Sequence, residues 1–180
     1  MMAKNEVSLT SLVVEKEADQ KHASKKPSAE KPSAKKKGGK NRRKSRELAL
    51  KAVYRGMLNQ SEMSAVYRDM AEDPDYAKAD EAYFRQLLEA VGEHVAELDE
   101  KMAAFIDRQV AELSPIEHAI LRISACELMF DMSIPYRVVI NEGVELAKIY
   151  GGIDGHKYIN GVLDKMAADV RASEVQNNRN

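Results

Sequence analysis

The sequence has no tryptophan, one cysteine and no apolar run that approaches the length of a membrane span. The lone Cys126 excludes an internal disulfide, and its apolar helical surroundings predict a buried, unreactive thiol in a reducing, cytosolic setting. A helix that crosses a bilayer needs about 20 apolar residues, so we expect a soluble protein without a membrane segment. The apolar patch over 7–14 is followed by Glu15 and Glu17, unlike a signal or transit peptide.

The sequence also lacks recognisable arrangements of catalytic or metal-binding residues. It contains no glycine-rich phosphate loop after a strand and no nucleophile flanked by a base. The four histidines show no ligand spacing with Cys126 or with one another; they are His22, His94, His118 and His156. We therefore expect no cofactor, no metal and no enzymatic activity.

What the sequence has instead is charge of both signs, unevenly divided along the chain. Residues 1–46 carry 14 basic and 5 acidic side chains, whereas residues 47–180 carry 14 basic and 24 acidic ones. The segment 35–46 alone holds eight lysines and arginines and no acid. A run this basic that leads into a helix predicts a binding site for a polyanion, above all nucleic acid. The acidic remainder suggests a second, cationic partner.

The chain divides into an extension, a folded body and a short tail. Residues 1–40 contain few large apolar side chains after Val14 and repeat a Lys-Pro-Ser-Ala pattern at 26–29 and 31–34. Such a segment buries too little surface to offset the entropy of ordering, so we expect it to be disordered. The predicted helical domain covers 41–172, and 173–180 is a polar tail.

Helical periodicity runs through the whole predicted domain, and no segment alternates like a strand, so the expected fold class is all-α. The first helix is expected to begin near Glu47, and a weaker one to cover 61–72. A longer pattern covers 84–106, with a bend near Gly92.

Capping signals mark three further helices. Ser114, Pro115 and Glu117 form a capping-box pattern that starts a helix ending near Met132. The next is expected over 136–150, with the glycines that follow it as a left-handed C-cap. The last helix is expected to use Asp154 as its N-cap.

Three motifs carry a resemblance to a known family. They are Arg42-Arg43-Lys44-Ser45-Arg46-Glu47-Leu48-Ala49, Pro135-Tyr136-Arg137-Val138-Val139-Ile140-Asn141-Glu142 and Lys157-Tyr158-Ile159-Asn160-Gly161-Val162-Leu163-Asp164-Lys165. Over about residues 42–171 the chain resembles the NusB family of bacterial transcription antitermination factors. The resemblance implies two small helical bundles packed together in one domain, and no catalysis.

The same resemblance implies specific partners. NusB pairs with the small-subunit ribosomal protein NusE, and the pair binds the boxA element of leader RNA. Loading onto the RNA polymerase antitermination complex then promotes transcription of ribosomal RNA operons. The family includes both monomers and dimers, so a homodimer stays open.

The resemblance also implies RNA-binding residues. The basic cluster that matches the family motif comprises Arg42, Arg43, Lys44 and Arg46, and the other matching positions are Tyr54, Asp154, Lys157 and Tyr158. Cations would hold phosphates, and Tyr158, where the family usually has phenylalanine, would stack on a base. A role as helix N-cap would by itself explain an aspartate at position 154. Tyr54 falls on an apolar stripe, which predicts a core residue at least as well as a contact with RNA.

Two positions match the family's NusE interface, Phe105 and Glu117. Periodicity alone favours a core position for Phe105, and the capping box gives Glu117 a competing role. Gly143 stands where the family usually has alanine, which predicts a cost of up to about 1 kcal/mol unless close packing uses the missing side chain.

Two other interpretations remain open. The first is the similar helical RNA-binding module of ribosomal RNA cytosine methyltransferases. Only nine residues, most of them polar, follow Arg171, which leaves no room for a cofactor-binding sheet, so we expect that only a fragment of such an enzyme would fit. The second alternative is a non-enzymatic adaptor whose basic tail binds polyanions without specificity. Preference for one RNA sequence over a scrambled one would separate this adaptor from the family function.

Overall fold

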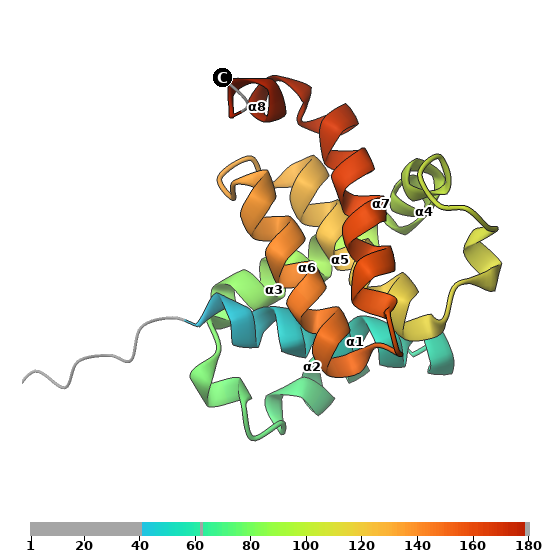
Figure 1. Cartoon of the computed structure of the whole chain (residues 1–180). Helices are drawn as coiled ribbons and strands as arrows, with labels where there is room; N and C mark the ends of the chain where they lie inside the picture. The colour runs from blue at the N-terminus through green and yellow to red at the C-terminus, as the bar shows by residue number, and fades with distance from the viewer. Residues whose placement is uncertain (1–40, 62, 179–180) are drawn as a thin grey trace, which may run out of the picture. The chain divides into compact units, whose positions relative to one another are not determined.

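The computed structural model describes residues 41–61 and 63–178 as helices joined by short loops (Figure 1). The extension predicted over 1–40 lies outside the described residues. The helices in chain order are α1 (Arg42–Asn59), α2 (Met63–Ala71), η1 (Tyr76–Lys78), α3 (Glu81–Glu93), α4 (Val95–Ala103), η2 (Val110–Glu112), α5 (Pro115–Phe130), α6 (Tyr136–Tyr150), α7 (Gly155–Val170) and α8 (Ala172–Asn177), where η marks a 3-10 helix.

Helix α5 occupies the centre of the described domain. It contacts α1, α3 and α4 as well as α6 and α7, while α6 and α7 run side by side (Figure 1). No strand forms in the described part of the chain, where the single β-type pairing joins Asn41 to Ala79. The all-α prediction is confirmed, and α5 joins an N-terminal helix group to a C-terminal one.

The apolar stripes of the helices meet in one continuous core. Phe84 is fully buried and makes edge-to-face contacts with Tyr67 and Tyr76 at centroid distances of 6.0 and 5.9 Å. Burying a side chain of this size stabilises the fold by about 1.5–3 kcal/mol. The predicted bend also occurs, because α3 ends at Glu93 and α4 begins at Val95.

Helix α1 begins five residues earlier than periodicity indicated, at Arg42 instead of near Glu47. The side chain of Asn41 accepts a hydrogen bond of 3.1 Å from the Lys44 amide and thereby caps the helix. The basic run carries no apolar stripe, so the hydrophobic pattern could not mark this first turn. The start of α1 is held by caps and ion pairs instead.

Two predicted caps have a different geometry. Gly151 follows α6 in an extended conformation (φ −82°, ψ 173°), so the predicted left-handed C-cap is wrong. A Cβ at Gly151 would lie 2.6 Å from the Ala147 carbonyl oxygen, so close approach explains the glycine. Asp154 precedes α7 in the left-handed region (φ 62°), and its side chain makes no capping hydrogen bond. Its carboxylate pairs with Lys157 instead, at 2.7 Å.

The capping box at α5 is half confirmed. The Ser114 hydroxyl accepts from the Glu117 amide at 3.3 Å, as predicted. The Glu117 carboxylate accepts from the Ser114 hydroxyl at 2.7 Å and not from its amide. One oxygen of Glu117 therefore remains directed toward neighbouring elements.

The far end of α5 is capped by a residue that the sequence did not mark. Arg171, between α7 and α8, is 5% exposed, and its guanidinium donates to the carbonyl oxygens of Leu128 (2.6 Å) and Asp131 (2.8 Å). These carbonyls are among those that a helix leaves without partners at its C-terminus. Much of the expected polar tail forms α8, in which Val175 is 7% exposed.

Adding a methyl group at two glycines in helix interiors should change the free energy of unfolding in opposite directions. We expect Gly161→Ala to raise the free energy of unfolding by about 0.5–1 kcal/mol, because its Cβ would meet open space. Gly143→Ala should lower it, because the Cβ would lie 2.7 Å from Ser124 Oγ and 2.9 Å from Leu163 Cδ1. Overpacking of a tight core costs about 1–3 kcal/mol and exceeds the gain in helix propensity. Urea unfolding of both variants measures this, and equal stabilisation would contradict the close packing of α5, α6 and α7.

Candidate nucleic-acid and protein interface

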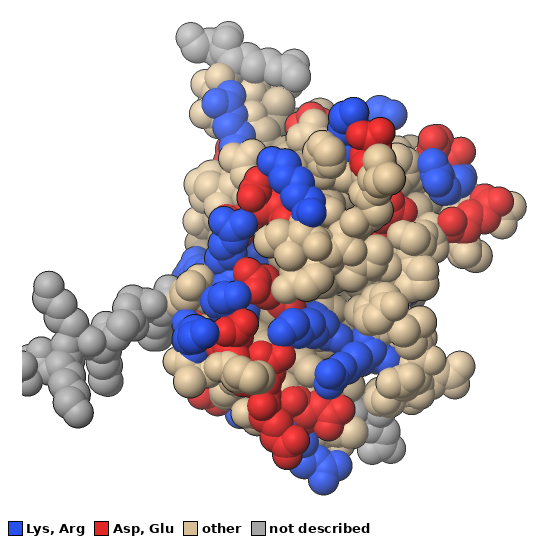
Figure 2. Space-filling view, turned by 60° about the horizontal axis from the view of Figure 1, so that its bottom comes forward, with Lys and Arg blue, Asp and Glu red and all other residues tan. Residues whose placement is uncertain are grey.

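The first turn of α1 presents cations that already have partners within the chain. Arg42 is exposed, and its guanidinium carbon lies 4.8 Å from the centroid of the Tyr83 ring. Arg43 is half exposed and forms an ion pair of 3.2 Å with Glu145 on α6. Figure 2 shows basic and acidic side chains interleaved over this side of the molecule. The α1 start is therefore a surface of neutralised charge and not a bare cationic patch.

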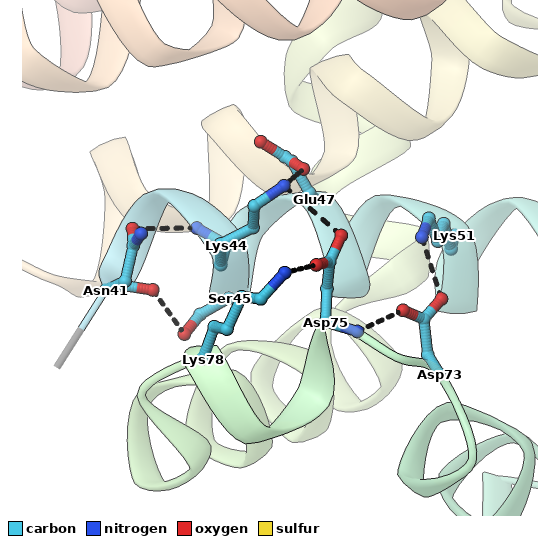
Figure 3. A network of polar contacts seen from close by, with 8 residues as sticks. All are labelled: Asn41, Lys44, Ser45, Glu47, Lys51, Asp73, Asp75 and Lys78. Atoms are coloured by element: carbon cyan, nitrogen blue, oxygen red, sulfur yellow. Dashed lines mark hydrogen bonds and ion pairs between the residues drawn. The ribbon is translucent and has the colours of Figure 1, made fainter. Parts of the chain in front are cut away.

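Lys44 is partly exposed and contacts two carboxylates from different elements. Its ammonium group lies 2.7 Å from Glu47 Oε2 and 3.3 Å from Asp75 Oδ2 (Figure 3). Hydrogen bonds to Glu47 and Asp75 raise the pKa of Lys44. Asp75 also accepts from Lys78, which lowers the pKa of the Asp75 carboxyl. A phosphate that approaches Lys44 must compete with these carboxylates.

Arg46 has a different position from the rest of the basic run. Its side chain is 5% exposed, and Nε lies 2.9 Å from Glu127 Oε1 and 3.1 Å from Oε2. Glu142 on α6 approaches the same guanidinium at 3.7 Å. Arg46 therefore joins α1 to α5 and α6, and its burial leaves no surface for an RNA phosphate.

The start of α7 brings together three of the other predicted RNA residues, Asp154, Lys157 and Tyr158. Lys157 and Asp154 are exposed and pair with each other, whereas Tyr158 is half buried against the core. The Arg108 guanidinium carbon lies 4.7 Å from the centroid of the Tyr158 ring. Arg108 Nε donates a hydrogen bond of 2.8 Å to Asp107 Oδ1. Burial and the nearby Asp107 raise the pKa of Tyr158. A guanidinium above an aromatic ring is a planar platform on which a base can stack.

The two predicted interface residues lie near this platform. A Cβ at Gly155, the first residue of α7, would lie 3.2 Å from Glu117 Oε1, so Glu117 sits close to the α7 start. Phe105 is half buried three residues before Arg108, with the Lys101 ammonium 6.0 Å from the centroid of its ring. Tyr54 is also half buried and packs against the core, as the apolar stripe predicted. The structure thus brings Glu117 together with the α7 residues and leaves Tyr54 on α1.

Sequence reasoning missed three cations at these sites. Lys78 belongs to the Asp75 cluster, Arg108 covers Tyr158, and Lys148 pairs with Glu145 at 2.8 Å, so that Arg43 and Lys148 share one carboxylate. No motif includes them. Each is recognisable only once the fold has brought separate segments together.

Three further observations concern metal ions, membrane-spanning helices and the single cysteine. Among them, no group of three or more histidine, cysteine, aspartate or glutamate side chains is placed to hold a metal ion. In the same residues, no helix combines the length and apolar character that crossing a membrane requires. Cys126 is 2% exposed, and burial raises the pKa of its thiol to about 12, as expected of an unreactive cysteine.

The fold and these surfaces define an all-helical binding protein with a basic helix start and an aromatic platform. The model of the NusB family matches residues 43–168, so the chain belongs to the NusB family. Relatives include the transcription antitermination protein NusB of Methylobacillus flagellatus, 62% identical over 78% of this chain and 92% of that protein. The corresponding protein of Thiobacillus denitrificans is 49% identical over 76% of this chain and 94% of its own length. Membership in this family makes the protein a transcription antitermination factor and not an enzyme.

Solved structures show the same fold. NusB of T. maritima superposes with a TM-score of 0.66 at 24% identity, covering 76% of this chain and 97% of that one. A structure described as antitermination factors NusB and NusE in complex with double-stranded RNA gives a TM-score of 0.61 at 24% identity, over 69% of this chain and 94% of that one. The predicted all-helical fold is thereby confirmed.

The buried Arg46–Glu127 pair should make stability depend on pH. Burial raises the pKa of Glu127 to about 7, against the opposing effect of the Arg46 guanidinium. The folded chain then binds a proton more tightly than the unfolded chain, whose glutamate titrates near 4.5. The resulting stabilisation is complete below about pH 4.5 and disappears as pH rises through about 7. Urea unfolding from about pH 5 to 7.5 should show this decline in the free energy of unfolding.

Glu127→Gln should remove most of the decline, because it lacks the titrating carboxyl. Exposed Glu100 on α4 provides the matched control, and Glu100→Gln should keep the profile of the original chain. Identical profiles for the original chain and Glu127→Gln would show that Glu127 stays ionised in the folded state throughout this range.

Proposed function

We propose that the protein binds a boxA-type leader RNA together with the ribosomal protein NusE. In this proposal it acts within the RNA polymerase antitermination complex and promotes transcription of ribosomal RNA operons. A cytoplasmic location follows from these partners. The main support is the α7 start, where Lys157, the Arg108–Tyr158 platform and Glu117 meet. Family membership and the likeness to a NusB–NusE complex with RNA support it further.

Each part of this surface suits one element of a ribonucleotide strand. Lys157 is 70% exposed and stands in the first turn of α7, where the positive end of the helix dipole favours a phosphate. The Arg108–Tyr158 platform suits a base, because stacking does not depend on base identity. The RNA strand would continue over the end of α6, past Lys148, to Arg43 and Arg42. Four contacts between cations and phosphates would give a log–log salt slope of about −3 for single-stranded RNA.

Glu117 supports joint binding of RNA and protein. Its half-buried side chain has one oxygen on the Ser114 hydroxyl and the other near Gly155. A cationic side chain of NusE that paired with Glu117 would reduce the negative potential beside the α7 start. Reduced repulsion of phosphate would make binding of NusE and RNA mutually favourable, and such coupling is reciprocal.

The proposal predicts sequence-selective binding. With NusE present, a boxA-like RNA should bind at least about tenfold more tightly than a scrambled RNA of the same composition, a difference of about 1.4 kcal/mol. Fluorescence anisotropy with labelled RNA measures both affinities, with and without NusE. A nonspecific polyanion adaptor would bind both RNAs equally in the presence of NusE, and that result would reject the proposal.

The platform can be tested at Tyr158. Tyr158→Ala should weaken binding of the boxA-like RNA by about 1–3 kcal/mol, the usual contribution of one stacked base. Tyr158→Phe should bind like the original chain, because the ring is kept and the buried hydroxyl has no hydrogen bond of normal geometry within the described residues. Circular dichroism should confirm that both variants keep their helices. Unchanged RNA affinity in a folded Tyr158→Ala variant would exclude stacking at this position.

A further inference from the structure

Asp75 lies at the meeting point of two lysines from separate elements. Its Oδ2 is 3.3 Å from Lys44 Nζ on α1, and its Oδ1 is 2.8 Å from Lys78 Nζ on η1 (Figure 3). Two cations that converge on two oxygens of one anion form the arrangement that a phosphate group needs. We propose that Lys44 and Lys78 form a phosphate-binding site for RNA, and that Asp75 occupies it as an internal competitor.

The competitor is held in place by contacts that do not involve either lysine. The Asp75 amide donates to Asp73 Oδ1 at 2.9 Å, and Asp73 Oδ2 accepts from Lys51 at 2.7 Å (Figure 3). Ser45 on α1 donates to the Asp80 carbonyl oxygen at 2.8 Å and ties the far end of the same segment to α1. The segment 73–80 is therefore anchored at both ends, and the carboxylate of Asp75 stands beside Lys44 whether or not Lys78 contacts it.

The site is accessible to a ligand. The side chain of Lys78 is 67% exposed, and those of Lys44 and Asp75 are 29% and 28% exposed. Glu47, whose side chain is 10% exposed, holds Lys44 from the protein side, so Lys44 stays oriented when Asp75 is displaced. Ion pairs between exposed groups are weak, and an RNA phosphodiester, which like a carboxylate shares one negative charge between two oxygens, can replace the Asp75 carboxylate.

Displacement of Asp75 lowers RNA affinity in two ways. The ion pairs with Lys44 and Lys78 must be given up, and the released carboxylate stays near the incoming phosphate as a like charge. Contacts to phosphate carry no sequence information, so the effect is the same for every RNA. Asp75 thus restrains nonspecific binding at the α1 start and leaves discrimination to the α7 start. This inference rests on the proposed function, because it assigns the site to RNA.

Asp75→Asn tests the inference because the amide keeps the shape of the side chain and removes its charge. In the presence of NusE, the variant should bind boxA-like and scrambled RNA more tightly by the same factor, about two- to fivefold near 50 mM salt. The log–log salt slope should become more negative by about 0.7 if one phosphate contact is gained. Lys78→Ala in the Asp75→Asn background should abolish most of the gain.

Asp169→Asn is the matched control. Asp169 on the last turns of α7 pairs with Lys101 at 2.6 Å, so this variant also removes one negative charge and frees one lysine, but away from the α1 start. RNA affinity should then stay within about twofold of the original chain, as expected for a distant exposed charge. An equal gain in Asp169→Asn and Asp75→Asn would overturn the inference, because net charge alone would explain it.

The remaining outcomes separate the inference from the proposed function. If the original chain prefers boxA-like RNA and a folded Asp75→Asn variant shows no gain, the phosphate site is wrong and the proposed function stands. If the original chain shows no preference in the presence of NusE, the proposed function fails on its own measurement. Should Asp75→Asn lose helical content, Lys78→Ala in the original chain decides instead. A loss of RNA affinity in that variant supports the site, and unchanged affinity overturns it.

Discussion

The buried contact between Arg46 and Glu127 determines how the N-terminal basic segment meets the rest of the domain. Both side chains are almost fully buried, and the guanidinium also faces Glu142 and the Tyr83 ring, whose centroid lies 5.3 Å away. Removal of one partner of a buried ion pair typically costs about 3–5 kcal/mol. The pair therefore fixes the position of α1 on α5 and α6. The direction in which Arg42, Arg43 and Lys44 project follows from it.

Once α1 is fixed in this way, its exposed cations face acidic side chains from other elements. Arg43 reaches Glu145 on α6, and Lys44 reaches Asp75 before η1. A polyanion does not meet free charge here but exchanges one set of ion pairs for another, so the net gain is smaller than the number of cations suggests. In the proposed function, binding strength and selectivity therefore depend strongly on the α7 start. In this protein, a basic run in the sequence therefore does not produce a strongly basic surface, because acidic side chains pair with its cations.

The sequence was sufficient for the fold class and for most helices, because apolar residues at helical spacing report burial directly. The interval 136–150 was predicted with its observed bounds, and Ser114 was identified as a cap from its residue type and position. The start of α1 was missed because polar caps and ion pairs, not apolar packing, hold its first turn. The left-handed C-cap at Gly151 was wrong, and Asp154 stands at the predicted N-cap position of α7 without the expected side-chain hydrogen bond, because residue type shows that an unusual backbone is tolerated without showing which backbone forms.

The site was less predictable than the fold, for a related reason. Motifs record neighbours along the chain, whereas Arg108 meets Tyr158, and Asp75 meets Lys44, only through tertiary packing. Identical residue types in one run can therefore have opposite roles. Arg43 remains half exposed while Arg46, three residues later, is in the core, because the two side chains face different neighbours of α1. In a helix that begins inside a basic segment, the acids contributed by the surrounding helices decide which cations remain on the surface and which become part of the scaffold.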